Sequence, residues 1–366
     1  YAPVGAHRDL LAYLVRRLLE NGANSSFVNQ IVDEDVSPQE VAADPFGMIA
    51  DVSRNIATGP ELFAPERINS SGFDLAHAPP LERIEPAPAP WATPRRNAVP
   101  LLAQDAAPLA AGDVINPSDL TPVGRVAAAS EADTATALAG ANPWDAPADT
   151  RAKVLNKAAD FYEEHFGELF AWLTREAGKT LPDCVSELRE AVDFLRFYAA
   201  RTPSDTKPAG IFTCISPWNF PLAIFSGQIA AALATGNAVL AKPAEQTPLI
   251  AYRAISLLHQ AGVPRSALQL LPGGGSVGAA LTSDKRVSGV AFTGSTTTAL
   301  KIRATMADTL RPGTPLIAET GGRNATTGAR TAQAEQPGPS THATAFQSAG
   351  PRAPAPRSLP RRPATP

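Results

Sequence analysis

One uncharged run, residues 211–241, constrains the fold of this chain more than any other feature. It contains no Asp, Glu, Lys, Arg or His and is long enough to cross a membrane as a helix. Pro217 and Pro221 lie within it, and two prolines so close together break a single helix. We therefore expect a β-α-β unit with both faces of its strands covered rather than a transmembrane segment. The expected elements are a strand at 211–215, a loop at 216–221, a helix at 222–234 and a strand at 238–241.

Helices and strands alternate on both sides of this unit. Ser130 and Asp133 fit the first and last positions of a capping box, and Asp149 with Thr150 is expected to cap the next helix. The alternation predicts a doubly wound α/β domain. The further expected helices cover 131–140, 149–164, a stretch ending at 178, 184–200 and 247–262, and the further strands cover 268–271, 287–292 and 316–319.

The composition excludes several classes of protein. The net charge is −3, from 32 basic and 35 acidic residues, so we expect no nucleic-acid partner. Two cysteines cannot form a disulfide framework, which indicates a reducing, cytoplasmic location. We assign no metal ligands. The chain begins at Tyr1 without Met or a secretory signal pattern, and we interpret it as a fragment.

Four short motifs stand where open α/β sheets bind ligands, at the ends of strands. The sequence GGGSVG at 273–278 matches G-x-G-x-x-G, but no acid follows about 20 residues later, which favours a loop leading into a helix over a dinucleotide fingerprint. Residues 292–295 (FTGS) follow a strand and open a helix, where backbone N–H groups can hold a phosphate. Lys242 and Glu245 end a buried strand. Glu319 ends another, and from its position alone it is equally an ordinary loop acid.

The motifs PWNFP, KPAEQTP, FTGS and ETGG, in this order, resemble the aldehyde dehydrogenase superfamily. The longer run at 215–248 resembles the L-glutamate γ-semialdehyde dehydrogenase unit of the bifunctional proline utilization A family. Residues 1–30 are similar to the last strand-helix segment of that family's proline dehydrogenase barrel. The resemblance covers 1–45 and about 117–324.

The resemblance implies a Rossmann-like NAD-binding domain and a role for each motif residue. Asn219 would donate a hydrogen bond to the oxyanion, and Glu319 would be the general base that activates water. In the family, a cysteine thiolate attacks the aldehyde, hydride passes to NAD, and water releases the product from the thioester. The remaining motif residues would bind the cofactor: Pro217, Trp218, Lys242, Glu245, Gly294 and Ser295.

A polar stripe on a helix expected at 7–21 allows two interpretations. Tyr13, Arg16, Arg17 and Glu20 fall at i, i+3, i+4 and i+7, which suits either a solvated helix face or a paired-arginine clamp for a carboxylate. The resemblance implies the clamp, with proline as the substrate. FAD would belong to the parent enzyme alone, because one segment cannot close a barrel, and we expect no proline oxidation from this chain.

The nucleophile that the family needs is missing. Cys184 falls in an expected helix and Cys214 in a buried strand, where a thiol is inert. Residues 346–357 (FQSAGPRAPAPR) resemble the family loop FxSAGQRCSALR, and the cysteine position holds Ala353 (353 − 319 = 34). Eight prolines between 337 and 366 predict a tail that cannot pair into a sheet and stays disordered. A disturbed reading frame or truncated gene and a decayed pseudoenzyme both explain this tail.

We therefore expect a member of the proline-to-glutamate pathway that is inactive as written. The parent would oxidise L-glutamate γ-semialdehyde with NAD, act on small molecules and form a homo-oligomer. The alternatives are a non-catalytic NAD-binding remnant and an interaction fragment with an exposed leucine-rich helix. The expected parts are a barrel remnant at 1–45, an extended Pro/Ala-rich linker at 46–116, the NAD-binding domain at 117–324 and a degraded tail at 325–366.

Overall fold

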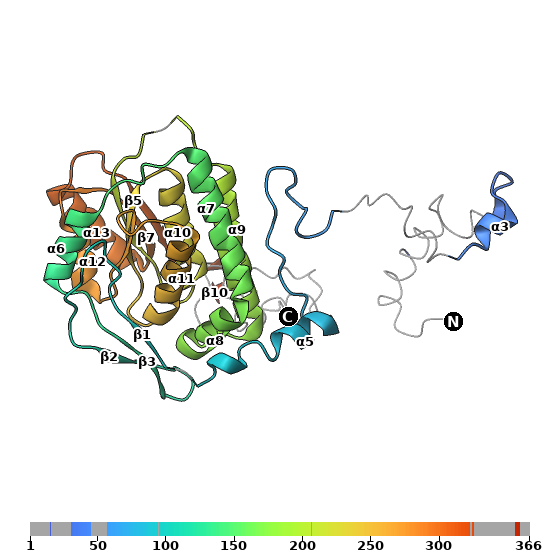
Figure 1. Cartoon of the computed structure of the whole chain (residues 1–366), viewed down its shortest axis with the longest axis horizontal. Helices are drawn as coiled ribbons and strands as arrows, with labels where there is room; N and C mark the ends of the chain where they lie inside the picture. The colour runs from blue at the N-terminus through green and yellow to red at the C-terminus, as the bar shows by residue number, and fades with distance from the viewer. Residues whose placement is uncertain are drawn as a thin grey trace, which may run out of the picture. The chain divides into compact units, whose positions relative to one another are not determined.

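A computed structural model describes residues 15, 31–44, 57–93, 95–205 and 207–322, together with the backbone of two short strands, β9 (Asn324–Ala325) and β10 (Pro356–Ser358) (Figure 1). The chain divides into two units, residues 1–57 and 58–366. In the first unit the structure describes a short helix, α3 (Pro38–Val41), which Ser37 caps. The four stripe residues Tyr13, Arg16, Arg17 and Glu20 lie outside the described residues.

A five-stranded parallel sheet is the centre of the second unit. Its strand order is β6-β5-β4-β7-β8, with every neighbouring pair parallel. The central β-α-β unit is confirmed, because all five positions of β5 are buried and β4 lies between β5 and β7. The strands are β4 (Ile211–Ile215), β5 (Ala238–Lys242), β6 (Leu268–Leu270), β7 (Val287–Gly294) and β8 (Leu316–Thr320).

Helices cover both faces of this sheet, as the doubly wound prediction requires (Figure 1). Successive residues of β5 alternate between the two layers: Val239 packs with one cluster of helices and Leu240 with the other. One layer contains α7 (Ala148–Glu164), α8 (Phe166–Ala177), α9 (Leu181–Ala200), α10 (Ala223–Ala234) and α11 (Pro248–Ala261). The other contains α6 (Glu131–Gly140), α12 (Gly275–Ser283) and α13 (Thr296–Thr309). None of the described helices has the length and apolarity needed to cross a bilayer.

Local capping signals mark several of the described helix ends. Ser130 and Asp133 form the expected capping box at α6, with both reciprocal hydrogen bonds present. Gly178 ends α8 in the left-handed conformation (φ +65°), which suits glycine. The expected cap of α7 was wrong: Pro147 precedes the helix and Asp149 lies inside its first turn, where its charge suits the helix dipole.

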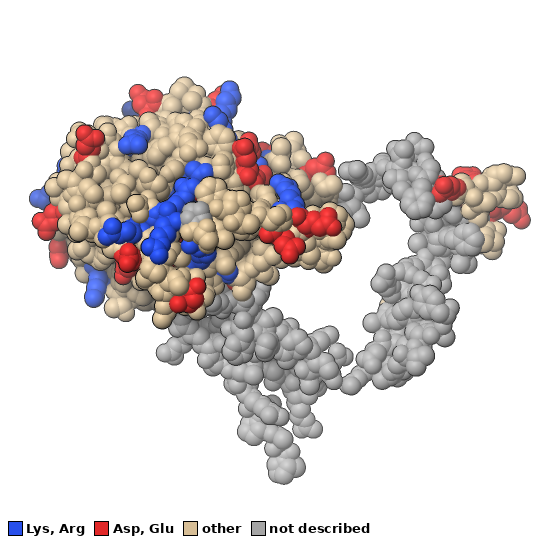
Figure 2. Space-filling view, turned by 60° about the horizontal axis from the view of Figure 1, so that its bottom comes forward, with Lys and Arg blue, Asp and Glu red and all other residues tan. Residues whose placement is uncertain are grey.

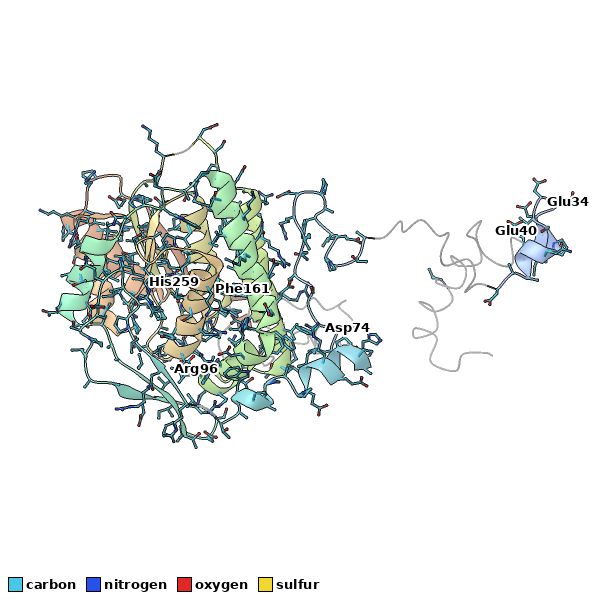
Figure 3. All side chains as sticks on the ribbon, in the orientation of Figure 1. Glu34, Glu40, Asp74, Arg96, Phe161 and His259 are labelled. Carbon is cyan, nitrogen blue, oxygen red and sulfur yellow. The ribbon has the colours of Figure 1, made fainter. Side chains whose placement is uncertain are left out.

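Residues 58–116 pack onto the domain instead of forming the extended linker expected within 46–116. Ser70 donates from both its N–H and its hydroxyl to Asp193, at 2.7 and 3.0 Å. Arg96, labelled in Figure 3, pairs with the buried Glu168 and lies over the ring of Trp91. These partners lie far away in sequence, so a local Pro/Ala pattern could not reveal them. The segment forms α5 (Ala78–Ile84), a 3-10 turn at Ala89–Trp91, β1 (Arg96–Ala98) and β2 (Gly112–Ile115), and β1 and β2 flank β3 (Pro122–Val126).

The proline-rich tail also differs from expectation at one place. Residues 356–358 form β10, which pairs in parallel with β9, although the prolines predicted that no part of 325–366 joins a sheet. Pro356 is the first residue of this two-stranded ladder, a position that strands tolerate for proline. Ala353 lies outside the described residues.

Candidate functional site

A cleft of about 1620 Å³ opens at the carboxyl ends of β4, β5, β7 and β8. Ligands bind at this edge of open α/β sheets. Every site residue predicted from the sequence within 117–324 lines this cleft, although these residues are spread over about 100 positions of the chain. They are Pro217, Trp218, Asn219, Lys242, Glu245, Gly294, Ser295 and Glu319. The structure thus brings these eight residues together, and their individual roles stay predictions.

Lys242 places a buried cation at one side of the cleft. Its side chain is 6% exposed, and its Nζ donates to the carbonyl oxygen of Pro243 at 2.9 Å. The carboxylate of Glu245, whose side chain is 58% exposed, lies 3.8 Å from Nζ. Burial lowers the pKa of Lys242 and the charge of Glu245 partly opposes that shift. An ammonium group has three donors, so this pair can hold a ligand with neighbouring hydroxyl groups.

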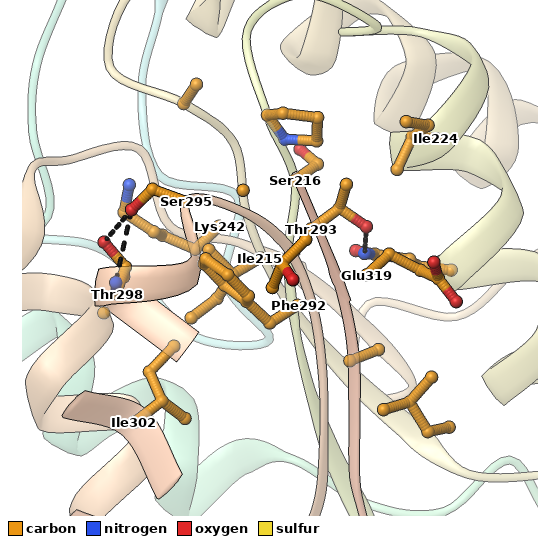
Figure 4. A pocket seen from close by; sticks show the side chains of 18 of the residues that line it. Ile215, Ser216, Ile224, Lys242, Phe292, Thr293, Ser295, Thr298, Ile302 and Glu319 are labelled. Atoms are coloured by element: carbon orange, nitrogen blue, oxygen red, sulfur yellow. Dashed lines mark hydrogen bonds between the residues drawn. The ribbon is translucent and has the colours of Figure 1, made fainter. Parts of the chain in front are cut away.

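The N-terminus of α13 faces the same cleft, beyond the end of β7 (Figure 4). Ser295 is its N-cap: its Oγ accepts from the N–H of Thr298 at 3.2 Å. A Cβ at position 294 would come within 2.6 Å of the Phe292 ring, so a side chain there would force that ring to move. Free N–H groups and the helix dipole together favour an anion at this end of a 14-residue helix.

A buried ion pair at α9 supports the loop that carries Asn219. Lys179 and Glu187 are both buried and lie 3.1 Å apart, Nζ to Oε1. Glu187 also accepts from the N–H of Ala223, the first residue of α10, at 2.9 Å. The Nζ of Lys179 lies 4.5 Å from the centroid of the Phe220 ring. The part of the loop that follows Asn219 is therefore held at Phe220 and Ala223. Sequence reasoning missed this role because Lys179 and Glu187 belong to no recognisable motif.

Glu319 and the glycine-rich segment complete the walls of the cleft. Glu319 lies in β8, whose last four residues are exposed, and its Cα is in register with Thr293 on β7. The segment 273–278 leads into α12, which confirms the loop-to-helix interpretation. A Cβ built on Gly275 would have no atom within 4 Å, so the backbone stays open to a ligand there.

Neither cysteine can act in the cleft. The chain has two, Cys184 and Cys214, which are 0% and 1% exposed. Burial raises the pKa of each thiol to about 12. Neither cysteine lines the cleft, so the expectation that neither acts as the nucleophile stays a prediction that their burial supports.

Family comparisons agree with this geometry. The model of the aldehyde dehydrogenase family matches residues 105–359, and the model of proline dehydrogenase matches residues 1–30. The bifunctional protein PutA of Klebsiella aerogenes is 47% identical over 387 residues, covering 98% of this chain and 29% of that protein. A 1-pyrroline-5-carboxylate dehydrogenase of Geobacillus kaustophilus is 35% identical over 264 residues, 64% of this chain and 51% of its own length.

Solved structures give the same relationship. Bradyrhizobium japonicum proline utilization A matches with a TM-score of 0.78 at 42% identity, covering 98% of this chain and 36% of that one. A 1-pyrroline-5-carboxylate dehydrogenase from Thermus with bound NAD matches with a TM-score of 0.73 at 28% identity, over 80% of this chain and 62% of that one. This chain spans about 29% of the length of the PutA relatives that it matches. From the motifs, the fold and these matches, the chain belongs to the aldehyde dehydrogenase family.

Proposed function

We propose that this chain supplies the NAD site of an enzyme of proline catabolism that oxidises L-glutamate γ-semialdehyde to L-glutamate. The observation that carries the proposal is the convergence of a buried lysine, a helix N-terminus, Asn219 and Glu319 on one cleft. Similarity to a 1-pyrroline-5-carboxylate dehydrogenase and to PutA proteins supports this substrate. The proline dehydrogenase match at residues 1–30 supports a parent that also oxidises proline with FAD, with Tyr13, Arg16, Arg17 and Glu20 at the proline carboxylate.

The residues present fit NAD. Lys242 and Glu245 would hold ribose hydroxyl groups, and Ser295 with the first N–H groups of α13 would hold the pyrophosphate. The open backbone at Gly275 and the volume of the cleft leave room for a dinucleotide. Pro217 and Trp218 would cover the cofactor from the loop after β4. When bound, NAD supplies the acceptor for the hydride of the aldehyde.

Two residues of the cleft suit the chemistry on the aldehyde carbon. The side-chain N–H of Asn219 would stabilise an oxyanion, the charge that develops when a carbonyl is attacked. The carboxylate of Glu319 would take a proton from the water that releases the product. The Lys179–Glu187 ion pair would keep the Asn219 loop in place during both steps.

This chain, as written, binds the cofactor without turnover in our proposal. The specific observation is that both cysteines are buried away from the cleft and that the expected nucleophile position holds Ala353. An alanine methyl group cannot form a thioester. The expected activity with glutamate semialdehyde and NAD, followed by NADH absorbance, is therefore zero, and appreciable turnover would overturn this assignment of Ala353.

Cofactor binding is tested by calorimetry and thermal melts with NAD. We expect saturable binding and a rise in Tm that increases with NAD concentration. The double variant Lys242→Ala plus Glu245→Ala should lose the shift, whereas Lys285→Ala plus Glu82→Ala should keep it, because these exposed residues lie outside the cleft. No shift at high NAD in the unmodified chain would refute the proposed cofactor.

The parent would be a homo-oligomeric, cytoplasmic enzyme without a nucleic-acid site in this region. Two free, buried thiols support a reducing compartment. Acidic side chains surround a short band of basic ones on the face seen in Figure 2, and the net charge of −3 supports the absence of a polyanion partner. Light scattering and cell fractionation of the parent enzyme test the assembly and the location.

A further inference from the structure

A second, much smaller cavity lies between residues 70–83 and two helices of the domain. Its volume is about 40 Å³, and it shares no lining residue with the cleft. The loop before α5 and α5 itself form one side of it, and α7 and α9 form the other. The proposed function uses none of its residues. They are Ser70, Ser71, Gly72, Phe73, Arg83, Glu163, Leu188 and Arg189.

Two arginines line this cavity from different segments of the chain. Arg83 lies on α5, with its Cζ 4.9 Å from the centroid of the Phe166 ring and 5.5 Å from that of Phe73. The two rings hold the guanidinium group in place without giving it an anionic partner. Arg189 lies on α9. Neither arginine forms an ion pair with an acidic residue in the described part of the chain.

The backbone at Gly72 lets Arg189 lie against the loop. A Cβ built on Gly72 would lie 3.0 Å from Cδ and 3.1 Å from Nε of Arg189. Gly72 also has a φ of +65°, a conformation that favours glycine. Any other residue at this position would therefore both strain the loop and displace the arginine from the cavity.

The one carboxylate of the cavity already has its partners. Oε1 of Glu163 accepts from the N–H of Ser71 at 2.7 Å, and Oε2 accepts from Arg196 at 2.7 Å. Arg196 also pairs with Asp160, whose side chain is exposed and does not line the cavity. The hydroxyl of Ser71 makes no hydrogen bond in the described part of the chain. Among the lining residues, two cations thus face one anion whose oxygen atoms are both engaged.

Guanidinium groups in this arrangement suit an anion that presents several oxygen atoms. A single water needs about 10–15 Å³ of such volume, so the cavity has room for an ion of a few atoms but not for an organic ligand. We propose that the cavity binds a free inorganic oxyanion of the size of phosphate. The ion lies between Arg83 and Arg189, and the hydroxyl of Ser71 is a third donor. It joins α5 to α9 and so fastens residues 70–83 to the domain, independently of the proposed function.

The test is a calorimetric titration of the full chain with sodium phosphate at pH 7.5, compared with sodium chloride at equal ionic strength. ADP-ribose is present in excess to fill the cleft, because the N-terminus of α13 is another place where phosphate could bind. We expect saturable binding of one phosphate per chain, which chloride does not reproduce. Amide hydrogen exchange should slow at residues 70–73 and in α5 when phosphate is added.

Two arginine variants test the proposed contacts. Arg83→Gln and Arg189→Gln should each weaken phosphate binding about tenfold or more, since each removes a charge-assisted hydrogen bond. Arg265→Gln is their control, because it changes an exposed arginine that lines neither the cavity nor the cleft. This control should bind phosphate as the unmodified chain does.

Two glycine variants separate the site from general stability. Gly72→Ala should weaken phosphate binding as well, because the new Cβ takes space that Arg189 occupies. Gly313→Ala introduces a similar backbone strain, at a φ of +84°, but its Cβ would have no atom within 4 Å. Both variants should lose stability, and only Gly72→Ala should lose phosphate affinity.

Several outcomes would overturn the inference. Absence of saturable binding to the unmodified chain, or binding that chloride reproduces, refutes it without requiring any variant to fold. Phosphate binding that ADP-ribose abolishes, or that persists unchanged in both arginine variants, places the ion elsewhere and refutes it too. Failure of ADP-ribose itself to bind overturns the proposed function alone, since the arginine variants still decide whether this cavity holds phosphate.

Discussion

Glu176 should make this protein less stable as the pH rises from acid to mildly alkaline values. Its carboxyl group is buried at the end of α8 and accepts the N–H groups of Leu249 and Ile250 at 2.6 and 2.8 Å, at the start of α11. Burial raises its pKa from 4.5 to about 8, although the two N–H groups act in the opposite direction.

The sign of the effect follows from proton uptake. Between pH 4.5 and about 8 the folded protein keeps the proton on Glu176 and the unfolded chain has released it. Stability is therefore fully present below pH 4.5 and is lost as the pH rises toward 8. One pKa unit corresponds to about 1.4 kcal/mol, so a shift of this size is worth on the order of a few kcal/mol.

The assay is urea unfolding of the unmodified chain and Glu176→Gln at pH 5 and pH 9. Glutamine stays neutral, so the variant lacks this loss of stability. At pH 5 we expect it to be less stable by about 1 kcal/mol, because an amide oxygen replaces only one of the two acceptors. At pH 9 the stability of the variant relative to the unmodified chain should be greater than at pH 5 by a few kcal/mol, which would narrow or reverse the difference between them.

A matched control, Glu82→Gln, changes an exposed carboxylate on α5 and should give the same difference at both pH values. If Glu176→Gln becomes relatively less stable at pH 9, the helix N-terminus outweighs desolvation and the reasoning about Glu176 is wrong. If the unmodified chain and Glu176→Gln differ in free energy of unfolding by the same amount at both pH values, water reaches this carboxyl group.

Three further predictions concern the two thiols, a helix cap and a buried ion pair. Cys184 and Cys214, with pKa values near 12, should resist iodoacetamide at pH 8 until the protein is unfolded, as mass spectrometry can check. Ser130→Ala should lower the free energy of unfolding by about 1 kcal/mol, measured by denaturant titration, because the capping box loses one bond. Lys179→Met should cost about 3–5 kcal/mol by leaving Glu187 unpaired, and adding Glu187→Leu should recover part of that loss.

Much of the fold could be predicted because its signals are local. The strand of residues 211–215 and the helix after Pro221 follow from an uncharged run that two prolines interrupt, and the structure places them within one residue of the expected bounds. Parallel strands buried on both faces are continuously apolar, so this pattern identifies them even without alternation. The prediction of a capping box at Ser130 and Asp133 was correct for the same reason, because the whole motif is contained in four residues.

The prediction of an extended linker within 46–116 was wrong because the contacts of this segment are not local. Arg96 pairs with Glu168, Ser70 with Asp193, and Arg196 donates to the carbonyl oxygen of Asn69 at 3.1 Å. Each pair joins residues more than 70 positions apart, and no property of the Pro/Ala-rich stretch indicates the partner. Proline-rich composition limits helix and strand formation, but it does not prevent a segment from packing through side-chain charges.

In the cleft, too, the motif residues could be predicted from the sequence, whereas the residues that support them could not. Residues such as Lys242 and Ser295 could be predicted because each stands where a strand ends, and parallel strands bring those ends to one edge. Lys179 and Glu187 could not be predicted, because each contacts the loop of Asn219 only in the folded chain. A buried pair such as Lys179 and Glu187 can therefore hold a loop of the cleft in place although neither residue belongs to a motif.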